Sequence, residues 1–281
     1  MRFALSSEQV QFAETLAALL AKSDAARAWP RGDHAPGLKV WRQLEDLGVT
    51  TLAQDGSPID VVVAMEAIGY HALPGPAIET IAVVPGQGLV TVAIPPHVPY
   101  AVDADVAEPF LIQDGTLWRA EPGVQVKADR RLFELKPAGS VGPAPVDAFD
   151  NGALACAAQL LGAGRALLTR TVEYARQRTQ FGKPIGGYQA VKHHLASTHI
   201  ALELARPLVY AAAIGEIPVS AAKVKTTEAA TQAARTALQV HGAIGYTQEN
   251  DLNHWLTMVR TLSTAWGTTS LHRSRLMAAL T

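Results

Sequence analysis

Two stretches of the chain decide its fold: YARQRTQFGKPIGGYQAVKHHLA at residues 174–196 and ALQVHGAIGYTQEN at residues 237–250. In the first, an apolar helical pattern stops at a segment rich in glycine and proline, and a second helical pattern starts at about Tyr188. In the second, a helical pattern reaches His241 and ends at Gly242, a residue type that suits a helix C-terminus. Both stretches therefore predict long helices that are joined by tight turns.

Long helices are predicted only in the second half of the chain, because 14 of the 17 prolines lie at or before Pro145 and proline breaks helix interiors. Asp150 or Asn151 is the predicted N-terminal cap of the first long helix, which ends before Gly182. Further helices are predicted over residues 188–214, 218–241, 250–262 and 269–280. Helices of this length with short connections favour an antiparallel bundle.

The first half of the chain combines helices with a short β segment. Apolar spacing predicts helices over residues 6–22, 38–47 and 59–69. Short runs rich in β-branched and aromatic residues follow at 89–135, and Asp114-Gly115 between FLIQ and TLWR is a strong hairpin signal. The predicted fold class is mainly α. We expect an N-terminal helical domain at 1–84, a shortened β segment at 85–148 and a C-terminal helix bundle at 149–281.

The composition excludes several functional classes. Hydrophobic residues make up 48% of the 281 residues and charged residues 17%, with 24 basic against 25 acidic side chains. The chain has no basic block of the kind that phosphate backbones require, so no nucleic-acid partner is predicted. The single cysteine, Cys156, allows neither an intrachain disulfide nor a zinc site of several thiolates, and it favours a reducing compartment.

Neither a metal site nor a membrane segment is predicted. His193 and His194 are adjacent and therefore point apart on a helix, and the chain has no His-Glu-x-x-His pair. Polar residues interrupt the first apolar stretch of the chain, which is unlike a secretory signal. The Ala-rich runs are broken by polar residues or fall short of the ~20 residues that span a bilayer. The predicted location is cytoplasmic.

The two quoted stretches resemble the C-terminal helical domain of acyl-CoA dehydrogenases. In that family, an Arg-x-x-Phe-Gly turn and a later Gln-x-x-Gly-x-x-Gly turn help to hold FAD, and this chain has both in the same order. The stretches APGLKVWRQLEDLGV at 35–49 and VVVAMEAIGYHALPGPAIET at 61–80 resemble the family's helical amino-terminal domain. The resemblance covers most of the chain and is poorest between about 89 and 148.

The resemblance implies a set of cofactor-binding residues at these turns. An arginine can neutralise a pyrophosphate with hydrogen bonds in fixed geometry, and a glycine lets the backbone approach a phosphate closely. Taken singly, such residues are more often a solvated helix-end charge and a helix cap. Taken together, the residues implied to contact FAD are Arg178, Gln180, Phe181, Gln189, Gln239 and Gly242.

The same resemblance indicates that this chain lacks the family's catalytic base. That base is a carboxylate, which removes the α-proton of an acyl-CoA thioester while hydride leaves the β-carbon for the flavin. In most members it precedes a Gly-Thr pair, and here that position is Trp266. In others it starts the first long C-terminal helix, which falls on Gly152 or within one residue of it. An indole has no basic lone pair, so no catalytic residue is predicted.

Other candidates for chemistry have simpler explanations. Among nearby acids, Glu249 and Asp251 follow the second turn, and Glu173 lies on a helix face that we expect to be solvated. We predict that none of them replaces the base. Residues 162–165, Gly-Ala-Gly-Arg, resemble part of a dinucleotide loop, but no strand precedes them and they lie within a helical pattern. Close helix packing is their predicted role.

The β segment is also much shorter than the family's central β domain, which covers the flavin ring. The resemblance therefore implies half of a site, as in the heteromeric acyl-CoA dehydrogenases of bacterial steroid catabolism. A full-length partner subunit would supply the glutamate and the ring pocket, this chain would complete the shared FAD site, and it would be inactive alone. The implied assembly is α2β2, the substrate a bulky, steroid-derived acyl-CoA, and the acceptor an electron-transfer flavoprotein.

Two alternatives remain open at this point. The chain could be a non-enzymatic assembly module of the same complex, which keeps the bundle but has no flavin role. It could also be a self-sufficient flavoenzyme in which the base has moved to another position.

Overall fold

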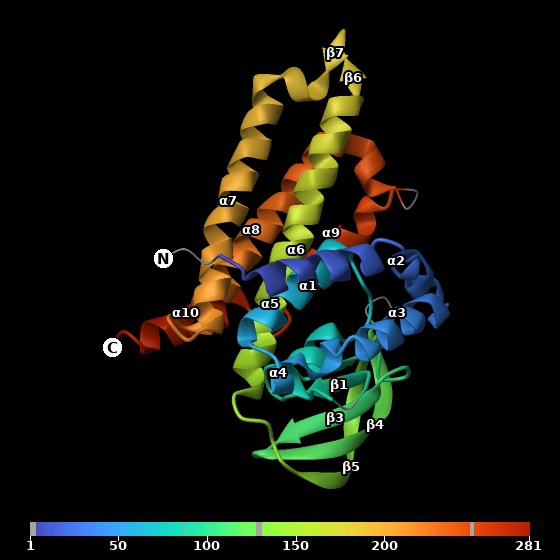
Figure 1. Ribbon diagram of the computed structural model, residues 1–281, viewed down its shortest axis with the longest axis vertical. Coiled ribbons are helices and arrows are strands. Elements are labelled where there is room, and N and C mark those ends of the chain that lie inside the picture. Colours follow the sequence, from blue (N-terminus) through green and yellow to red (C-terminus); the bar gives the residue numbers. More distant parts are fainter. Residues whose placement is uncertain (1–3, 87, 128–130, 248–249) are drawn as a thin grey trace.

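The computed structural model of the chain describes residues 4–86, 88–127, 131–247 and 250–281. A helix bundle lies at one end of the molecule and a small β-sheet at the other, with the N-terminal helices crossing between them (Figure 1). Helices account for most of the described residues, so the predicted mainly α fold is confirmed. The predicted domain boundaries at residues 84 and 148 stay a prediction, because one continuous apolar core runs from the N-terminal helices into the bundle.

Five helices form the C-terminal bundle: α6 (Ala148–Gln177), α7 (Gln189–Ala213), α8 (Val219–His241), α9 (Leu252–Leu262) and α10 (Thr269–Ala278). α6 is the central helix, since it packs against α5, α7, α8 and α9. By length and composition α6 could span a membrane, but 78% of its most apolar window is buried inside the molecule. It is therefore the core helix of the bundle.

The start of α6 differs from the prediction. The helix begins at Ala148, so Asp150 and Asn151 lie in its first turn and the predicted cap there is wrong. Asp147 precedes the helix with a left-handed backbone (φ 54°) and makes no side-chain capping hydrogen bond. The carboxylate of Asp150 instead forms a two-pronged ion pair with Arg275 on α10, at 2.5 and 2.8 Å. The Asp150 carboxylate, which the local sequence predicts to cap the helix, is therefore used in an ion pair with a residue far away in the chain.

Glycines allow α6 to cross α5 (Pro58–Tyr70) at backbone contact. A Cβ atom on Gly162 would lie 1.9 Å from the carbonyl oxygen of Glu66, and one on Gly69 would lie 2.0 Å from the carbonyl oxygen of Gln159. Since real Cβ atoms do not approach so closely, only glycine fits at these two positions. This explains residues 162–165 as a packing surface, as predicted.

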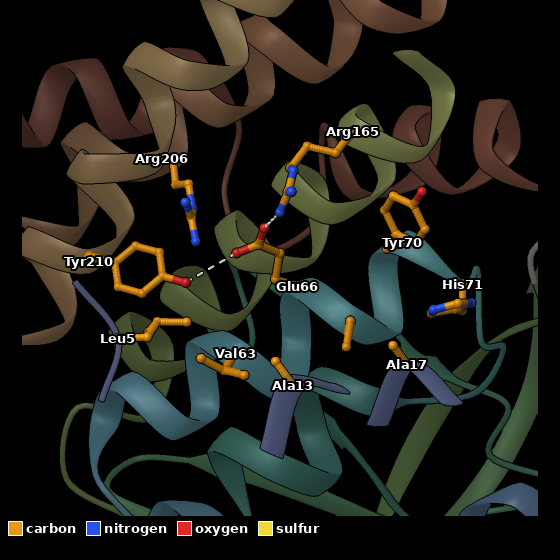
Figure 2. Close-up of a pocket in the computed structure, with 11 residues that line it drawn as sticks. Leu5, Ala13, Ala17, Val63, Glu66, Tyr70, His71, Arg165, Arg206 and Tyr210 are labelled. Atoms are coloured by element: carbon orange, nitrogen blue, oxygen red, sulfur yellow. Dashed lines mark hydrogen bonds and ion pairs between the residues drawn. The ribbon is translucent and has the colours of Figure 1, made fainter. Parts of the chain in front are cut away.

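A buried carboxylate reinforces the same crossing. Glu66 forms an ion pair with Arg165 on α6 and accepts a hydrogen bond of 3.3 Å from the Tyr210 hydroxyl on α7 (Figure 2). A buried charge is costly unless it is paired. These contacts therefore stabilise the carboxylate and connect α5 to two helices of the bundle.

The N-terminal part of the chain is a series of short helices that covers the lower half of α6. Ser6 caps α1 and Ser57 caps α5, each in a reciprocal capping box with the residue three positions later. The elements before the sheet are α1 (Ser7–Leu20), α2 (Ala25–Ala28), η1 (Trp29–Arg31), α3 (Ala35–Asp46), η2 (Val49–Thr51), α4 (Leu52–Asp55), α5 and the π-helical turn η3 (Glu79–Val83). The predicted helices at 6–22, 38–47 and 59–69 correspond to α1, α3 and α5.

The sheet has five strands in the order β1-β3-β4-β5-β2. β1 pairs with β3 in parallel, and the other pairs are antiparallel. Asp114 and Gly115 form the turn between β3 and β4 with φ values of 50° and 72°, as a tight hairpin requires. The strands are β1 (Val90–Ala93), β2 (Ala101–Val102), β3 (Glu108–Gln113), β4 (Thr116–Lys127) and β5 (Leu132–Pro143). The β segment therefore extends beyond the predicted end at 135.

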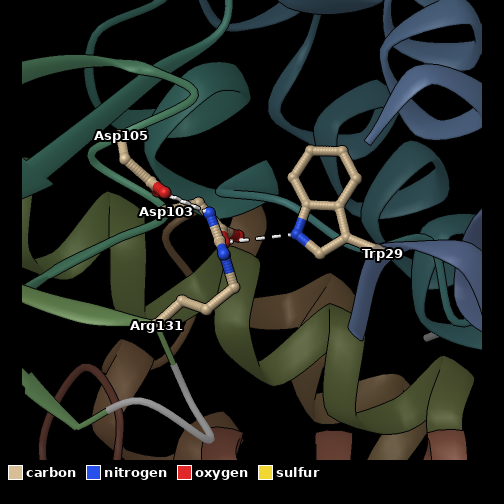
Figure 3. A network of polar contacts seen from close by, with 4 residues as sticks. All are labelled: Trp29, Asp103, Asp105 and Arg131. Carbon is tan, nitrogen blue, oxygen red and sulfur yellow. Dashed lines mark hydrogen bonds and ion pairs between the residues drawn. The ribbon is translucent and has the colours of Figure 1, made fainter. Parts of the chain in front are cut away.

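A polar network connects the sheet to the N-terminal helices. Arg131 forms ion pairs of 2.5 Å with both Asp103 and Asp105, and the indole N–H of Trp29 donates to Asp103 at 3.2 Å (Figure 3). Burial raises the pKa of Asp103, while the hydrogen bonds from Arg131 and Trp29 oppose that rise. The network adds a polar connection to the apolar contact that Val90, Val92 and Phe110 of the sheet make with the main core.

The crossing of α5 and α6 gives a first prediction. Gly162→Ala should lower the free energy of unfolding by about 2 kcal/mol, because overpacking costs about 1–3 kcal/mol and the added methyl meets the backbone of Glu66. Urea unfolding measures the change. Gly139→Ala is the control, since nothing lies within 4 Å of a Cβ there, and it should stay within about 0.5 kcal/mol of the parent. A Gly162→Ala chain as stable as the parent would contradict the proposed backbone contact.

Candidate functional site

The turn between α6 and α7 is a two-residue hairpin at the far end of the bundle (Figure 1). Its strands are β6 (Thr179–Gln180) and β7 (Lys183–Pro184), which pair antiparallel. Phe181 and Gly182 form the turn with φ values of 50° and 81°. A left-handed backbone is unusual for a bulky residue, and the Phe181 side chain is 92% exposed. The hairpin therefore presents an aromatic ring to the outside of the molecule.

Arg178 marks the end of α6 and the start of this hairpin. Its backbone N–H donates to the Tyr174 carbonyl at 2.8 Å, and its carbonyl accepts from the N–H of Ile185 at 2.8 Å. The backbone is thus fixed on both sides. The guanidinium is exposed and has no ion-pair partner within the described residues. Gln180 and Gln189, predicted beside it, are also exposed.

The second predicted turn follows α8. Gly242 has a φ of 64° and a ψ of −142°, and nothing lies within 4 Å of a Cβ atom built on it. Gln239 is exposed one turn earlier. The 3-10 turn η5 (Gly242–Tyr246) continues with Ile244 and Tyr246, which are 47% and 76% exposed. The open backbone at Gly242 leaves room for a ligand atom to approach.

A stack of two rings joins the turns. Tyr174 lies one turn before Arg178, His241 lies directly before Gly242, and their rings stack at 4.2 Å with an interplanar angle of 20°. Burial lowers the pKa of His241, and its Nδ1 lies 2.8 Å from the carbonyl oxygen of Ala237. The structure therefore brings the two predicted turns together at one exposed end of the bundle. An arginine, several amides and an open glycine are groups that can hold a pyrophosphate and an adenosine.

The two positions at which a catalytic glutamate was sought lie face to face, and one fills the other. A Cβ atom on Gly152 would lie 2.1 Å from Cε3 and Cζ3 of Trp266. The Trp266 side chain is 1% exposed and its backbone is left-handed, with a φ of 53°. The indole thus occupies the space in front of Gly152. A side chain at residue 152 could not coexist with this indole.

A buried polar chain holds Trp266 in place. His272 lies 2.8 Å from the Trp266 carbonyl through Nε2 and 2.9 Å from the Ser220 hydroxyl through Nδ1. Because a carbonyl can only accept, Nε2 carries the proton and Ser220 donates to Nδ1. Phe149 stacks on the His272 ring at 5.9 Å. His272 is fully buried, so this Ser-His pair is structural support for the Trp266 turn.

Sequence reasoning missed a buried acid beside Trp266. Glu79 lies in η3 and is 5% exposed. Burial raises the pKa of its carboxyl to about 7, although hydrogen bonds from its own backbone and from Trp266 oppose the rise. The signal in the sequence was a single carboxylate in the apolar run AIETIAVV. Its depth was not visible there, because it depends on packing under Trp266.

Comparison with known proteins places the chain in a family. Residues 143–281 match the family model described as acyl-CoA dehydrogenase, C-terminal domain. The chain is 29% identical over 282 residues to acyl-CoA dehydrogenase IpdE2 of Mycobacterium tuberculosis, with 88% of this chain and 89% of that protein covered. The C-terminal part of the chain, residues 143–281, belongs to the acyl-CoA dehydrogenase family.

Solved structures of acyl-CoA dehydrogenases share this fold. The ChsE4–ChsE5 complex of Mycobacterium tuberculosis matches with a TM-score of 0.77 and 18% identity, covering 100% of this chain and 99% of that one. A steroid acyl-CoA dehydrogenase, Tcur3481–Tcur3483, matches with a TM-score of 0.75 and 18% identity, covering 97% of each chain. At this identity the matches establish the fold alone.

The structure gives the surroundings of two of the other acids that were considered as bases. Asp251 forms an ion pair of 2.5 Å with Arg27, and that hydrogen bond lowers the pKa of Asp251. Glu173 is exposed on α6, as expected. Glu249 lies outside the described residues. Within the described residues no group of three His, Cys, Asp or Glu side chains is arranged to hold a metal.

The buried acid gives a prediction about pH. The folded-state pKa of Glu79, about 7, lies above the ordinary value of 4.5, so the unfolded chain releases this proton first. The stability from the neutral acid is present below about pH 4.5 and is lost as pH rises to about 7. As pH rises between these limits, the free energy of unfolding of Glu79→Gln should increase by about 3 kcal/mol relative to that of the parent, as measured by urea unfolding. The exposed control Glu173→Gln should show no such change in its free energy of unfolding relative to the parent. Parallel pH curves for Glu79→Gln and the parent would contradict the buried neutral acid.

Proposed function

We propose that this chain is the cofactor-completing subunit of a heteromeric FAD-dependent acyl-CoA dehydrogenase. In this proposal, a full-length partner subunit supplies the flavin-ring pocket and the catalytic glutamate. The enzyme removes hydrogen from the α and β carbons of an acyl-CoA, and this chain is inactive alone. The observation that carries the proposal is Trp266 seated on Gly152, because it fills both base positions of the family while the cofactor turns remain open.

Each residue at the bundle end has a defined task in this proposal. Arg178 would neutralise the pyrophosphate of FAD, since its charge has no partner within the described part of the chain. The open backbone at Gly242 would let that phosphate approach. Gln180, Gln189 and Gln239 would offer hydrogen bonds to the adenosine end. FAD, when bound, accepts the hydride that leaves the β-carbon of the acyl group.

Exposed apolar side chains support a partner subunit. Phe181 and Tyr246 lie at the turns, and Ile200 and Leu204 lie four residues apart on the outer face of α7. Such residues are costly to leave in water when they gather on one face. We propose that the partner covers this face in an α2β2 assembly, so that the flavin is shared between the two chains. Likeness to the ChsE4–ChsE5 complex supports the heteromeric arrangement.

The substrate and the location are extensions of the same proposal. We propose a bulky, steroid-derived acyl-CoA, which the likeness to a steroid acyl-CoA dehydrogenase supports. The electron acceptor would be an electron-transfer flavoprotein. The buried free thiol of Cys156 suits the reducing cytoplasm.

Purification with and without the partner tests the division of labour. The partner is identified by co-purification of this chain from its host. The chain alone should hold little flavin and should not oxidise acyl-CoA, whereas the complex should show a flavin spectrum and reduce an acceptor dye with substrate. Stoichiometric flavin and full activity in the chain alone would refute the proposal and favour a self-sufficient enzyme.

Arg178→Ala tests the cofactor role within the complex. We expect FAD to bind about tenfold or more weakly, because charge-assisted hydrogen bonds are lost. FAD titration of the apo-complex measures the change. Arg119→Ala is the matched control, since Arg119 is an exposed arginine on β4 that forms an ion pair with Glu108, and it should leave affinity unchanged. If Arg178→Ala also binds FAD normally, the chain is an assembly module without a flavin role.

A further inference from the structure

A second pocket lies away from the cofactor turns. α1, α5, α6 and α7 enclose a partly open cavity of about 250 Å³ (Figure 2). Arg165 and Arg206 line it from the bundle side, and Leu5, Ala13 and Val63 line it from the N-terminal side. Arg165 lies 13 residues before Arg178 on the same helix, which is roughly 20 Å along the axis. The cavity is therefore separate from the proposed FAD site.

The charges around the cavity do not balance. Glu66 carries one negative charge, and its ion pair with Arg165 neutralises it. Arg206 is always protonated, and the nearby carboxylates of Glu66 and Glu203 favour its charged form. Within the described residues, however, neither carboxylate lies at ion-pair distance from Arg206. Burial and the neighbouring Arg170 lower the pKa of His71, which keeps that ring neutral. Among the described side chains that line the cavity, one positive charge, that of Arg206, is left without an ion pair.

Arg206 also has an unused hydrogen-bond donor. Its guanidinium lies 5.3 Å from the centre of the Tyr210 ring and is hydrogen-bonded to the Tyr210 hydroxyl. Its Nε–H is buried and has no acceptor among the described residues. Figure 2 shows this guanidinium pointing into the space beside Tyr210 and Glu66. Buried donors are nearly always paired, so an acceptor from outside the chain is expected here.

The wall of the cavity opposite Arg206 indicates the chemistry of the rest of the ligand. It consists mainly of small and apolar side chains from α1 and α5, such as Ala13, Ala17 and Val63, while Tyr70 and His71 line the cavity at the end of α5. The volume would hold about eight waters at ~30 Å³ each. That space suits a planar anion of one charge with a short hydrocarbon body. A doubly charged phosphate would exceed the single uncompensated charge.

We propose that this cavity binds a small monocarboxylate with an apolar tail, with its carboxylate on Arg206 and its tail against α1. The site does not depend on FAD or on the partner subunit. Its failure in the test below would leave the proposed dehydrogenase function untouched, and failure of that function would leave this site standing.

Calorimetric titration of the full chain with octanoate tests the proposal. Octanoate should bind saturably at one site and raise the melting temperature. Octan-1-ol, which lacks the charge, and acetate, which lacks the tail, should each bind at least about tenfold more weakly. Octanol that binds as well as octanoate would overturn the assignment of Arg206 as the anion site. Absence of octanoate binding up to about 1 mM would overturn the site itself.

Variants place the ligand within the cavity. Arg206→Gln should weaken octanoate about tenfold or more, and the control Arg119→Gln should bind as the parent does. Ala13→Leu fills the cavity from α1 with a residue that favours helix, so it should abolish binding while the melting curve without ligand stays cooperative. Unchanged octanoate affinity in Arg206→Gln, or in Ala13→Leu, would contradict the proposed position.

Discussion

The close approach of α6 to its neighbours is the constraint on which the rest of the structure depends. A helix of 30 residues runs about 45 Å, and small residues line most of its buried length. Gly162 lets the α5 backbone touch it, and Gly164 admits Leu202 from α7. Because the backbone contact at Gly162 leaves no room for a methyl group, it fixes the middle of α6 against α5.

The two ends of α6 have opposite surroundings. At its N-terminal end, the Trp266 indole covers Gly152, Glu79 beside it is buried with a raised pKa, and Asp150 is paired with Arg275. At its C-terminal end, Arg178 and its neighbours are exposed, and the Tyr174–His241 stack and the packing of α6 on α8 hold the two turns together. Buried side chains surround the N-terminal end of α6, whereas exposed polar side chains surround its C-terminal end. The arrangement keeps the covered Gly152–Trp266 contact and the two exposed turns at opposite ends of α6.

Local chemistry explains which features were predictable from sequence. The hairpin at Asp114-Gly115, the end of α8 at Gly242 and the cofactor turns depend on residues that are neighbours in the chain, so their turn chemistry is visible there. The start of α6 was misplaced because Asp150 pairs with Arg275, 125 residues away. Both base positions were identified as lacking a carboxylate, but their mutual contact was not. That contact joins residues more than 100 positions apart and rests on packing alone.

The same distinction applies to Arg206. Sequence marks it as one more charge on a long amphipathic helix, and nothing local indicates that its Nε–H is buried or that Glu66 is already neutralised by Arg165. Only the crossing of α5 over α6 brings one carboxylate and two arginines together. The glycines that allow this crossing therefore do more than stabilise the core. By fixing how close the helices come, they decide which charges are compensated within the chain and which are left for a ligand.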